Sequence, residues 1–309
     1  MSKAASKNVP ASVRQRLLNV AKKTDDEFQA LLTRYALERL LFRLGKSAHR
    51  EELVLKGAFL YLAWGEAASR PTKDVDFLAS GEAEIERFVD LTKDICSIHD
   101  PSDGLEYETD SVSGKPIREQ PLHDGIRIHL LAHLGNARIP LQIDIGFGDA
   151  VSPDPVDISY PTILDLPAPS VRAYRIETVI AEKFEALVSI GQATSRLKDF
   201  FDIWRFSSVF SFDGGLLQRT FESTFDRRRT PVPAGDPPAL GTDFSSDPNR
   251  MRQWDRLVAR FAGDELIPSL AEVCEQIRTF VAPIISSIRD GQKLAGSWSP
   301  GGPWDFENK

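Results

Sequence analysis

The chain has 309 residues, of which 41% are hydrophobic and 27% are charged, as is ordinary for a globular protein with a sizeable core. Its formal net charge of −7 excludes a general binder of polyanions, so a nucleic-acid substrate would need a local basic surface. The chain has two cysteines, without metal-ligand spacing, and no apolar run near the roughly 18 residues of a membrane helix. Because the first residues do not form a signal peptide, we expect a cytoplasmic protein with no membrane partner.

The first half of the chain mixes two hydrophobic periodicities. Apolar residues three and four positions apart predict helices, whereas alternation with a period of two predicts strands. Gly135-Asn136 is a turn signal between two such strands, so these strands are predicted to form a hairpin. The predicted helices cover 10–45 and 83–98, and the predicted strands cover 73–80, 126–133 and 139–147.

The second half of the chain is mostly helical, with an interruption at 229–250, where prolines and glycines oppose regular structure. The predicted helices cover 176–190, 197–210, 214–226, 251–262 and 266–288. The predicted fold class is therefore α+β, with a mixed sheet followed by a helical C-terminal part. The predicted domains are 1–170, 171–295 and a poorly ordered tail over 296–309.

Two aspartates stand one residue apart in RPTKDVDFL, residues 70–78. Residues i and i+2 of a strand point to the same face, so Asp74 and Asp76 project side by side while Val75 and Phe77 point into a core. Two carboxylates held that close repel each other, so a positive partner is expected between them. That partner is either a lysine or arginine side chain or a divalent metal ion.

A lysine interrupts the apolar stripe of the helix predicted over 176–190. On a helical projection, Lys183 falls inside the arc of apolar side chains. A lysine in that position is unfavourable unless its charge has a partner. A snorkelling side chain or a buried salt bridge explains the pattern as well as a functional role does.

Asp199 and Asp202 are three residues apart and lie on one face of the next predicted helix. A helix cap or a salt bridge between domains is a serious alternative to a functional role for Asp202. Two basic clusters could contact phosphates, Arg196 with Lys198 and the run of arginines at 227–229. Solvated surface charge is the simpler interpretation of either cluster taken alone.

Asp144 lies on the polar face of its predicted strand, together with Gln142 and Gly146. Exposure on an open sheet face would explain this position. If the strand neighbours the one that carries Asp74 and Asp76, the three carboxylates could hold two divalent cations for in-line phosphoryl transfer.

The segment Lys56-Gly57-Ala58 precedes a predicted helix. A glycine lets a phosphate approach the backbone, and the first N–H groups of a helix can bind it, although one glycine is a weak signal. The motifs HExxH, GxSxG, Walker A and GxGxxG are absent from the sequence, so zinc-protease, hydrolase, P-loop and dinucleotide-binding functions are not first choices.

Five segments, in this order, resemble the nucleotidyltransferase toxins of the AbiEii/AbiGii group, which includes the MenT toxins. The segments are LKGAFLYL, RPTKDVDFL, LQIDIGFGD, IETVIAEKFEAL and SRLKDFFDIW, and the similarity continues through TFDRRRTPVP and RQWDRLVARF. The resemblance therefore covers most of the chain. It implies a fold like the nucleotidyltransferase domain of DNA polymerase β with a helical C-terminal half, a bacterial origin, and an antitoxin encoded beside the toxin.

The resemblance also implies roles for single residues. Asp74 and Asp76 match the paired metal-binding aspartates, and Gly57 matches the glycine of the phosphate-binding turn. Lys183 matches the lysine that is expected to contact the nucleotide phosphates. Asp199 matches the aspartate of the KD motif that follows.

Other positions match the family less directly. Asp144 falls where the wider superfamily has its third carboxylate. Ala58 stands where a glycine or serine is usual, so a hydroxyl contact is lost. Thr72 lies near the first aspartate, Asp74, where related toxins have a serine or threonine that can be phosphorylated, although a strand-edge hydroxyl is the simpler interpretation. Lys56 and Thr72 join Gly57 and Lys183 as candidate nucleotide-binding residues.

The leading hypothesis is a nucleotidyltransferase that uses Mg²⁺ or Mn²⁺ and transfers NMP from an NTP to an acceptor hydroxyl. The resemblance favours the 3′ end of tRNA as the acceptor. Asp74, Asp76 and Asp144 are the predicted metal ligands, and Asp144 could also help to deprotonate the attacking hydroxyl. Lys183 and Asp199 complete the predicted catalytic set. The alternatives are an enzyme that modifies a protein hydroxyl, as in AMPylation, and a non-catalytic nucleotide-binding module.

Overall fold

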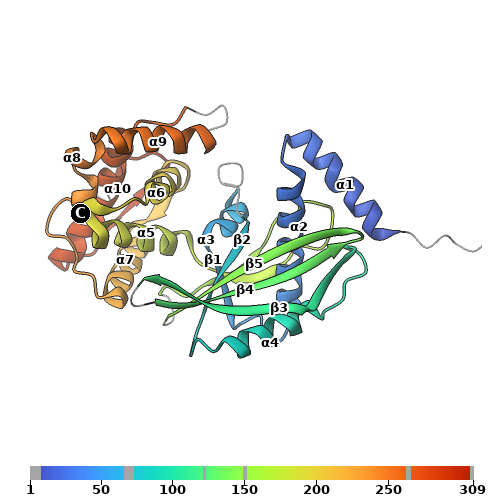
Figure 1. The fold of residues 1–309 in the computed structure, drawn as a ribbon. Coiled ribbons are helices and arrows are strands. Elements are labelled where there is room, and N and C mark those ends of the chain that lie inside the picture. The colour runs from blue at the N-terminus through green and yellow to red at the C-terminus, as the bar shows by residue number, and fades with distance from the viewer. Residues whose placement is uncertain (1–7, 66–72, 121–122, 149–151, 262–265, 307–309) are drawn as a thin grey trace, which may run out of the picture. The chain divides into compact units, whose positions relative to one another are not determined.

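The chain divides into two compact units, drawn in Figure 1. The first unit contains residues 1–149 and 156–173, and the second contains residues 150–155 and 174–309. Each unit is described by itself below. The residues that the computed structural model describes are 8–65, 73–120, 123–148, 152–261 and 266–306.

The first unit contains a seven-stranded sheet and the helices that cover it. Its strands are β1 (Leu53–Lys56), β2 (Asp74–Ala79), β3 (Leu105–Gln120), β4 (His123–Leu134), β5 (Ala137–Phe147), β6 (Val156–Ser159) and β7 (Ser170–Ala173). Its helices are α1 (Val9–Thr24), α2 (Phe28–Lys46), α3 (Gly57–Leu60), the 3-10 turn η1 (Tyr61–Trp64) and α4 (Ile85–Cys96). The strand order is β3-β4-β5-β2-β1-β7-β6. The pairs β2–β5 and β1–β7 are parallel and the others are antiparallel, so the predicted mixed sheet is confirmed.

Helices α2 and α4 pack on the apolar face of this sheet, the face that carries Ile128 of β4. A Cβ added at Gly114 of β3 would lie 2.6 Å from the side chain of Ile85 and 3.2 Å from that of Ile128, so α4 lies directly over this face. Tyr107 of β3 points the same way and donates its hydroxyl to the backbone oxygen of Ala36 in α2 at 2.6 Å. The opposite face of β4 and β5 is left to polar side chains.

A buried ionic network ties α2 to the segment before β3. The guanidinium groups of Arg39 and Arg43 both contact the buried carboxylate of Asp103, with Arg43 Nη1 2.6 Å from Oδ2. Glu38 is buried beside them, and its Oε2 accepts a hydrogen bond from the backbone N–H of Ile163. Its Oε1 has no hydrogen-bond partner among the described residues. Burial raises the pKa of Glu38 to about 7.

The second unit is mostly helical. Its helices are α5 (Ile176–Ile190), α6 (Leu197–Val209), α7 (Gly214–Arg228), α8 (Thr242–Ser245), α9 (Pro248–Phe261) and α10 (Leu270–Asp290), with 3-10 turns η3 (Gly191–Ala193) and η4 (Pro238–Leu240). A small sheet in the order β10-β9-β8 joins β8 (Phe212–Asp213), β9 (Gly296–Trp298) and β10 (Trp304–Phe306). The predicted α+β class is confirmed.

Two tryptophans order the C-terminal segment. The sequence predicts a poorly ordered tail over 296–309, but residues 296–306 contain β9 and β10. Trp298 and Trp304 are buried against Phe280, with ring centroids 4.9 and 6.1 Å from that of the phenylalanine. Each indole N–H donates to a backbone oxygen, at 2.6 and 3.0 Å. The glycines and prolines of the segment conceal these packing contacts in the sequence.

Glu38 gives the stability of the first unit a pH dependence. Its folded pKa of about 7 lies above the ordinary value of 4.5, so its favourable contribution is complete below pH 4.5 and is lost as the pH rises through 7. We expect the free energy of unfolding to fall by up to about 3 kcal/mol between pH 5 and pH 8 through this group. In Glu38→Gln this part of the fall should be absent. Urea unfolding of both proteins at the two pH values measures it, and an identical fall in the variant would contradict the prediction.

Candidate active site

The predicted aspartate pair lies on β2, at the middle of the sheet. Asp76 is opposite Asp144 of β5 on one side and opposite Lys56 of β1 on the other, while Asp74 is opposite Gln142 of β5. Directly opposed residues on neighbouring strands project to the same face, with strands about 4.8 Å apart. The structure therefore brings Asp74, Asp76, Asp144 and Lys56 together on the polar face of the sheet.

A row of charged residues crosses five strands at this point. From β1 through β2, β5 and β4 to β3, the residues at matching register are Lys56, Asp76, Asp144, Arg127 and Lys115. The two carboxylates stand in the centre, and a cation flanks them on each side. Lys56 is the cation at matching register on a strand beside β2, whereas Arg127 faces Asp144; the choice between a basic side chain and a divalent metal ion as the partner of Asp74 and Asp76 stays a prediction.

Arg127 holds Asp144 with two hydrogen bonds. Its Nε lies 2.7 Å from Oδ1 of Asp144 and its Nη2 lies 2.6 Å from Oδ2. The Asp144 side chain is only 8% exposed, against 30% for Arg127. The Nε2 of Gln142 also approaches Oδ2 of Asp144 at 3.3 Å and Oδ2 of Asp74 at 3.4 Å. Arg127 and Gln142 are therefore parts of the site that the sequence analysis did not assign. The signal in the sequence that could have found them is the alternation of polar and apolar residues along β4 and β5, which places both side chains on the polar face.

Gly57 leaves the space in which the Asp76 carboxylate lies. A Cβ at position 57 would stand 2.0 Å from Oδ2 of Asp76, and the backbone has φ = +72° there. Both facts call for glycine, the one residue without a Cβ and with easy access to positive φ. Gly146 leaves room for the end of Lys56, since a Cβ at 146 would stand 2.9 Å from the ammonium nitrogen, but this flexible end could move aside and glycine is not required there.

The donor set around Asp76 suits a divalent cation. Mg²⁺ is commonly bound by one or two carboxylates, with substrate phosphates and water completing its shell. Asp74 and Asp76 offer such a pair, and the space at Gly57 lets the carboxylate of Asp76 approach the backbone turn closely. Within the described part of the chain, no group of three His, Cys, Asp or Glu side chains is arranged to hold a metal ion. Thr72, the remaining candidate near this pair, lies outside the described residues.

In the second unit, Lys183 of α5 lies between two aspartates of α6. Its Nζ is 2.6 Å from Oδ1 of Asp199 and 2.8 Å from Oδ2 of Asp202. The side chains are 14%, 6% and 4% exposed, respectively. Burial alone would raise the pKa of Asp199, but the charges of Lys183 and Arg196 outweigh it and hold that pKa below its ordinary value. A buried salt bridge is therefore part of the explanation of Lys183, and its contact with a nucleotide stays a prediction.

The arginine run at 227–229 forms salt bridges within the second unit. Arg227 contacts Glu182 at 2.6 Å, and Arg228 contacts Glu185 at 2.6 Å, both on α5. The third arginine ends α7 in the left-handed conformation. Two of the three charges are thus neutralised by α5, which favours the structural interpretation of this cluster.

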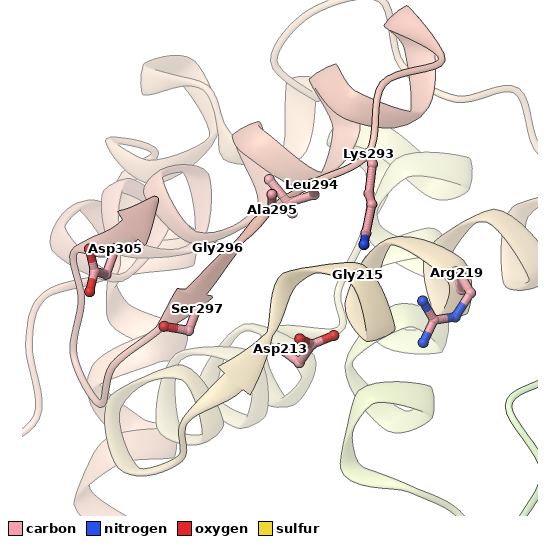
Figure 2. Close-up of a pocket in the computed structure, with 9 residues that line it drawn as sticks. All are labelled: Asp213, Gly215, Arg219, Lys293, Leu294, Ala295, Gly296, Ser297 and Asp305. Carbon is pink, nitrogen blue, oxygen red and sulfur yellow. The ribbon is translucent and has the colours of Figure 1, made fainter. Parts of the chain in front are cut away.

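A cavity of about 380 Å³ lies elsewhere in the second unit, and Figure 2 shows its lining. Two aspartates, Asp213 and Asp305, balance the cations Arg219 and Lys293 around it. Asp213 is already occupied as the cap of α7, where it accepts a hydrogen bond from the backbone N–H of Leu216. None of the predicted site residues lines this cavity.

The comparisons with known proteins agree with the resemblance seen in the sequence. The family model described as "Nucleotidyl transferase AbiEii toxin, Type IV TA system" matches residues 39–276, well over half of the chain. The chain belongs to the AbiEii nucleotidyltransferase toxin family. It is accordingly a nucleotidyltransferase of the toxin–antitoxin class, with a nucleotide substrate and an antitoxin partner.

Two solved structures from Helicobacter pylori are similar over most of their length. JHP933 is 17% identical with a TM-score of 0.45, and the match covers 86% of this chain and 95% of that one. A presumed nucleotidyltransferase is 16% identical with a TM-score of 0.44, and the match covers 84% and 97%. At TM-scores below 0.5 the assignment rests on the family match. A comparison with curated proteins finds no significant match. No described helix is both long and apolar enough to cross a membrane.

Replacing Gly57 should displace the Asp76 carboxylate. We expect Gly57→Ala to lower the rate of nucleotide transfer about 10²-fold, since a shift of 1 Å in a reacting group has this effect. Gly65→Ala is the matched control, because Gly65 also has positive φ (+80°) but an added Cβ meets nothing within 4 Å among the described residues. Steady-state transfer rates measure both. An equal loss in the two variants would show that backbone strain, and not the contact with Asp76, is responsible.

Removing Lys183 should destabilise the second unit whatever its catalytic role. Lys183→Met leaves Asp199 and Asp202 buried without their shared cation, so we expect the free energy of unfolding to fall by about 3 kcal/mol. Lys198→Met, at an exposed position of α6, should change it by less than about 0.5 kcal/mol. Chemical denaturation measures both, and an unchanged Lys183→Met protein would refute a stabilising role for the cluster.

Proposed function

We propose that this protein transfers NMP from an NTP to an acceptor hydroxyl in a reaction that depends on Mg²⁺ or Mn²⁺ held by Asp74 and Asp76. The observation that carries the proposal is the side-by-side position of these carboxylates on β2, with Gly57 leaving space for Asp76. Bound divalent cations would neutralise the triphosphate and activate the attacking hydroxyl. Family membership supports the same reaction class.

In this proposal, the residues of the first unit would bind the cation and the phosphates of the NTP. Asp74 and Asp76 would bind the cation, and the ammonium of Lys56, opposite Asp76, would attract a phosphate oxygen. The backbone at Gly57 can approach a phosphate closely because no side chain covers it. In the second unit, Lys183 would contact nucleotide phosphates, with Asp199 fixing its ammonium at 2.6 Å.

For the acceptor, we favour the 3′ end of tRNA. The partly exposed Lys56 is opposite Asp76, and the exposed Lys115 ends the same row on the edge strand β3, so cations are available on this face for an anionic acceptor. The acidic net charge of −7 favours the alternative, a protein hydroxyl modified as in AMPylation. The third hypothesis from the sequence, a non-catalytic nucleotide-binding module, is set aside because the family is one of nucleotidyltransferases. The cytoplasmic location stays a prediction.

A labelling experiment tests the proposal. The protein is incubated with Mg²⁺, each radiolabelled NTP in turn, and either total bacterial tRNA or a cell protein extract. We expect label on tRNA, and in Asp76→Asn a fall of about 10³-fold, because the loss of a metal ligand removes several kcal/mol of transition-state stabilisation. Asp90→Asn, on the exposed side of α4, is the control and should retain the wild-type rate.

Each outcome of the labelling separates the candidates. Label that appears only on protein would replace the tRNA acceptor by a protein hydroxyl. Label that persists in Asp76→Asn would refute the role of this carboxylate. No label on either acceptor, with NTP binding intact, would mean that the reaction needs a partner or an acceptor other than tRNA and the proteins of the extract.

A further inference from the structure

Asp144 is a firmly held carboxylate on the polar face of the sheet. Both of its oxygens are engaged by Arg127, at 2.7 and 2.6 Å, in the two-pronged geometry that makes guanidinium–carboxylate pairs strong. The Asp144 side chain is only 8% exposed, so this carboxylate is largely withdrawn from water. A carboxylate that coordinated a cation would have to give up part of this arrangement.

We propose that Asp144 is a positioning residue and not a third metal ligand: it fixes Arg127 beside the Asp74/Asp76 pair and, through Gln142, helps to orient Asp74. The proposal rests on the proposed function, because it assumes that Asp74 and Asp76 bind the divalent cation. It assigns to Arg127 and Gln142 a part in the site that the sequence pattern did not reveal.

The charges on this face support the assignment. Asp144 and Asp76 occupy matching positions on neighbouring strands, so their negative charges would repel each other if neither had a partner. Arg127 comes from the far side of Asp144, on β4, and cancels its charge. Asp74 and Asp76 are then the carboxylates of this face left to bind a divalent cation, with Lys56 opposite Asp76 on β1.

Gln142 links the neutralised pair to the metal-binding pair. Its amide nitrogen lies 3.3 Å from Asp144 Oδ2 and 3.4 Å from Asp74 Oδ2, at the long end of the hydrogen-bond range. The NH₂ group of a glutamine has two N–H donors, so one side chain can donate to both carboxylates. A carboxylate at position 142 would add charge where this amide adds none.

The test measures Mn²⁺ affinity in the full-length protein without nucleotide, by the electron paramagnetic resonance signal of free Mn²⁺. In Asp144→Asn the guanidinium of Arg127, no longer neutralised by Asp144, should repel the cation and weaken binding several-fold. In Arg127→Gln the uncompensated carboxylate should attract the cation and tighten binding several-fold. Tighter binding is an effect that damage to the fold would not produce.

The double variant Asp144→Asn/Arg127→Gln decides between the two roles. It removes both charges together and leaves no unpaired buried ion, so it should fold and bind Mn²⁺ within about threefold of the wild type. If Asp144 is a metal ligand, the double variant will bind as weakly as Asp76→Asn, and the proposal is overturned.

The rate of nucleotide transfer gives a second test of the Asp144–Arg127 pair. With Arg127 no longer fixed, Asp144→Asn should lower kcat about tenfold, and Asp144→Glu, which keeps the charge, should recover part of the loss. If Asp144→Glu is no better than Asp144→Asn, positioning through the ion pair is refuted. A failure of the proposed function looks different: there, Asp74→Asn and Asp76→Asn bind Mn²⁺ as well as the wild type does.

Discussion

Two carboxylates on neighbouring strands, Asp76 and Asp144, repel each other across the strand spacing of about 4.8 Å, and the polar face of the sheet is arranged around this repulsion. Lys56 approaches from β1 and Arg127 from β4, so a cation stands on each side. The parallel pairing of β2 with β5 places the two carboxylates opposite each other. The antiparallel neighbours of these strands, β1 and β4, carry the two cations. Gly57 then leaves the carboxylate of Asp76 the room it needs.

The second unit handles buried charge in the same way. Lys183 would be unfavourable in the apolar stripe of α5 without the two aspartates of α6, and the aspartates would be equally unfavourable without the lysine. Such mutual dependence complicates the interpretation of single substitutions, since lost activity can follow from lost structure. Variants that remove both charges of a pair separate the two effects better than alanine does.

Periodicity in the sequence was sufficient for much of the fold. The alternation in β5 predicted both the strand and the polar direction of Asp144, and the spacing of apolar residues predicted α5 closely. The strand β3 was not predicted, because it lies at the edge of the sheet and its polar and glycine residues weaken the alternation. Arg127 could not be predicted as the partner of Asp144, since their meeting depends on the register of β4 against β5. Pairing between strands is a long-range property that local periodicity does not contain.

The glycine at position 146 couples two places that are far apart in the sequence. The ammonium of Lys56 lies 2.9 Å from where a methyl group at position 146 would stand, so the two positions share a single volume. A side chain at 146 would push the flexible end of Lys56 aside, at little cost to folding, but it would move the ammonium out of the row that contains Asp76. The glycine at 146 therefore helps to set where the positive charge of Lys56 lies, although the two residues are on different strands.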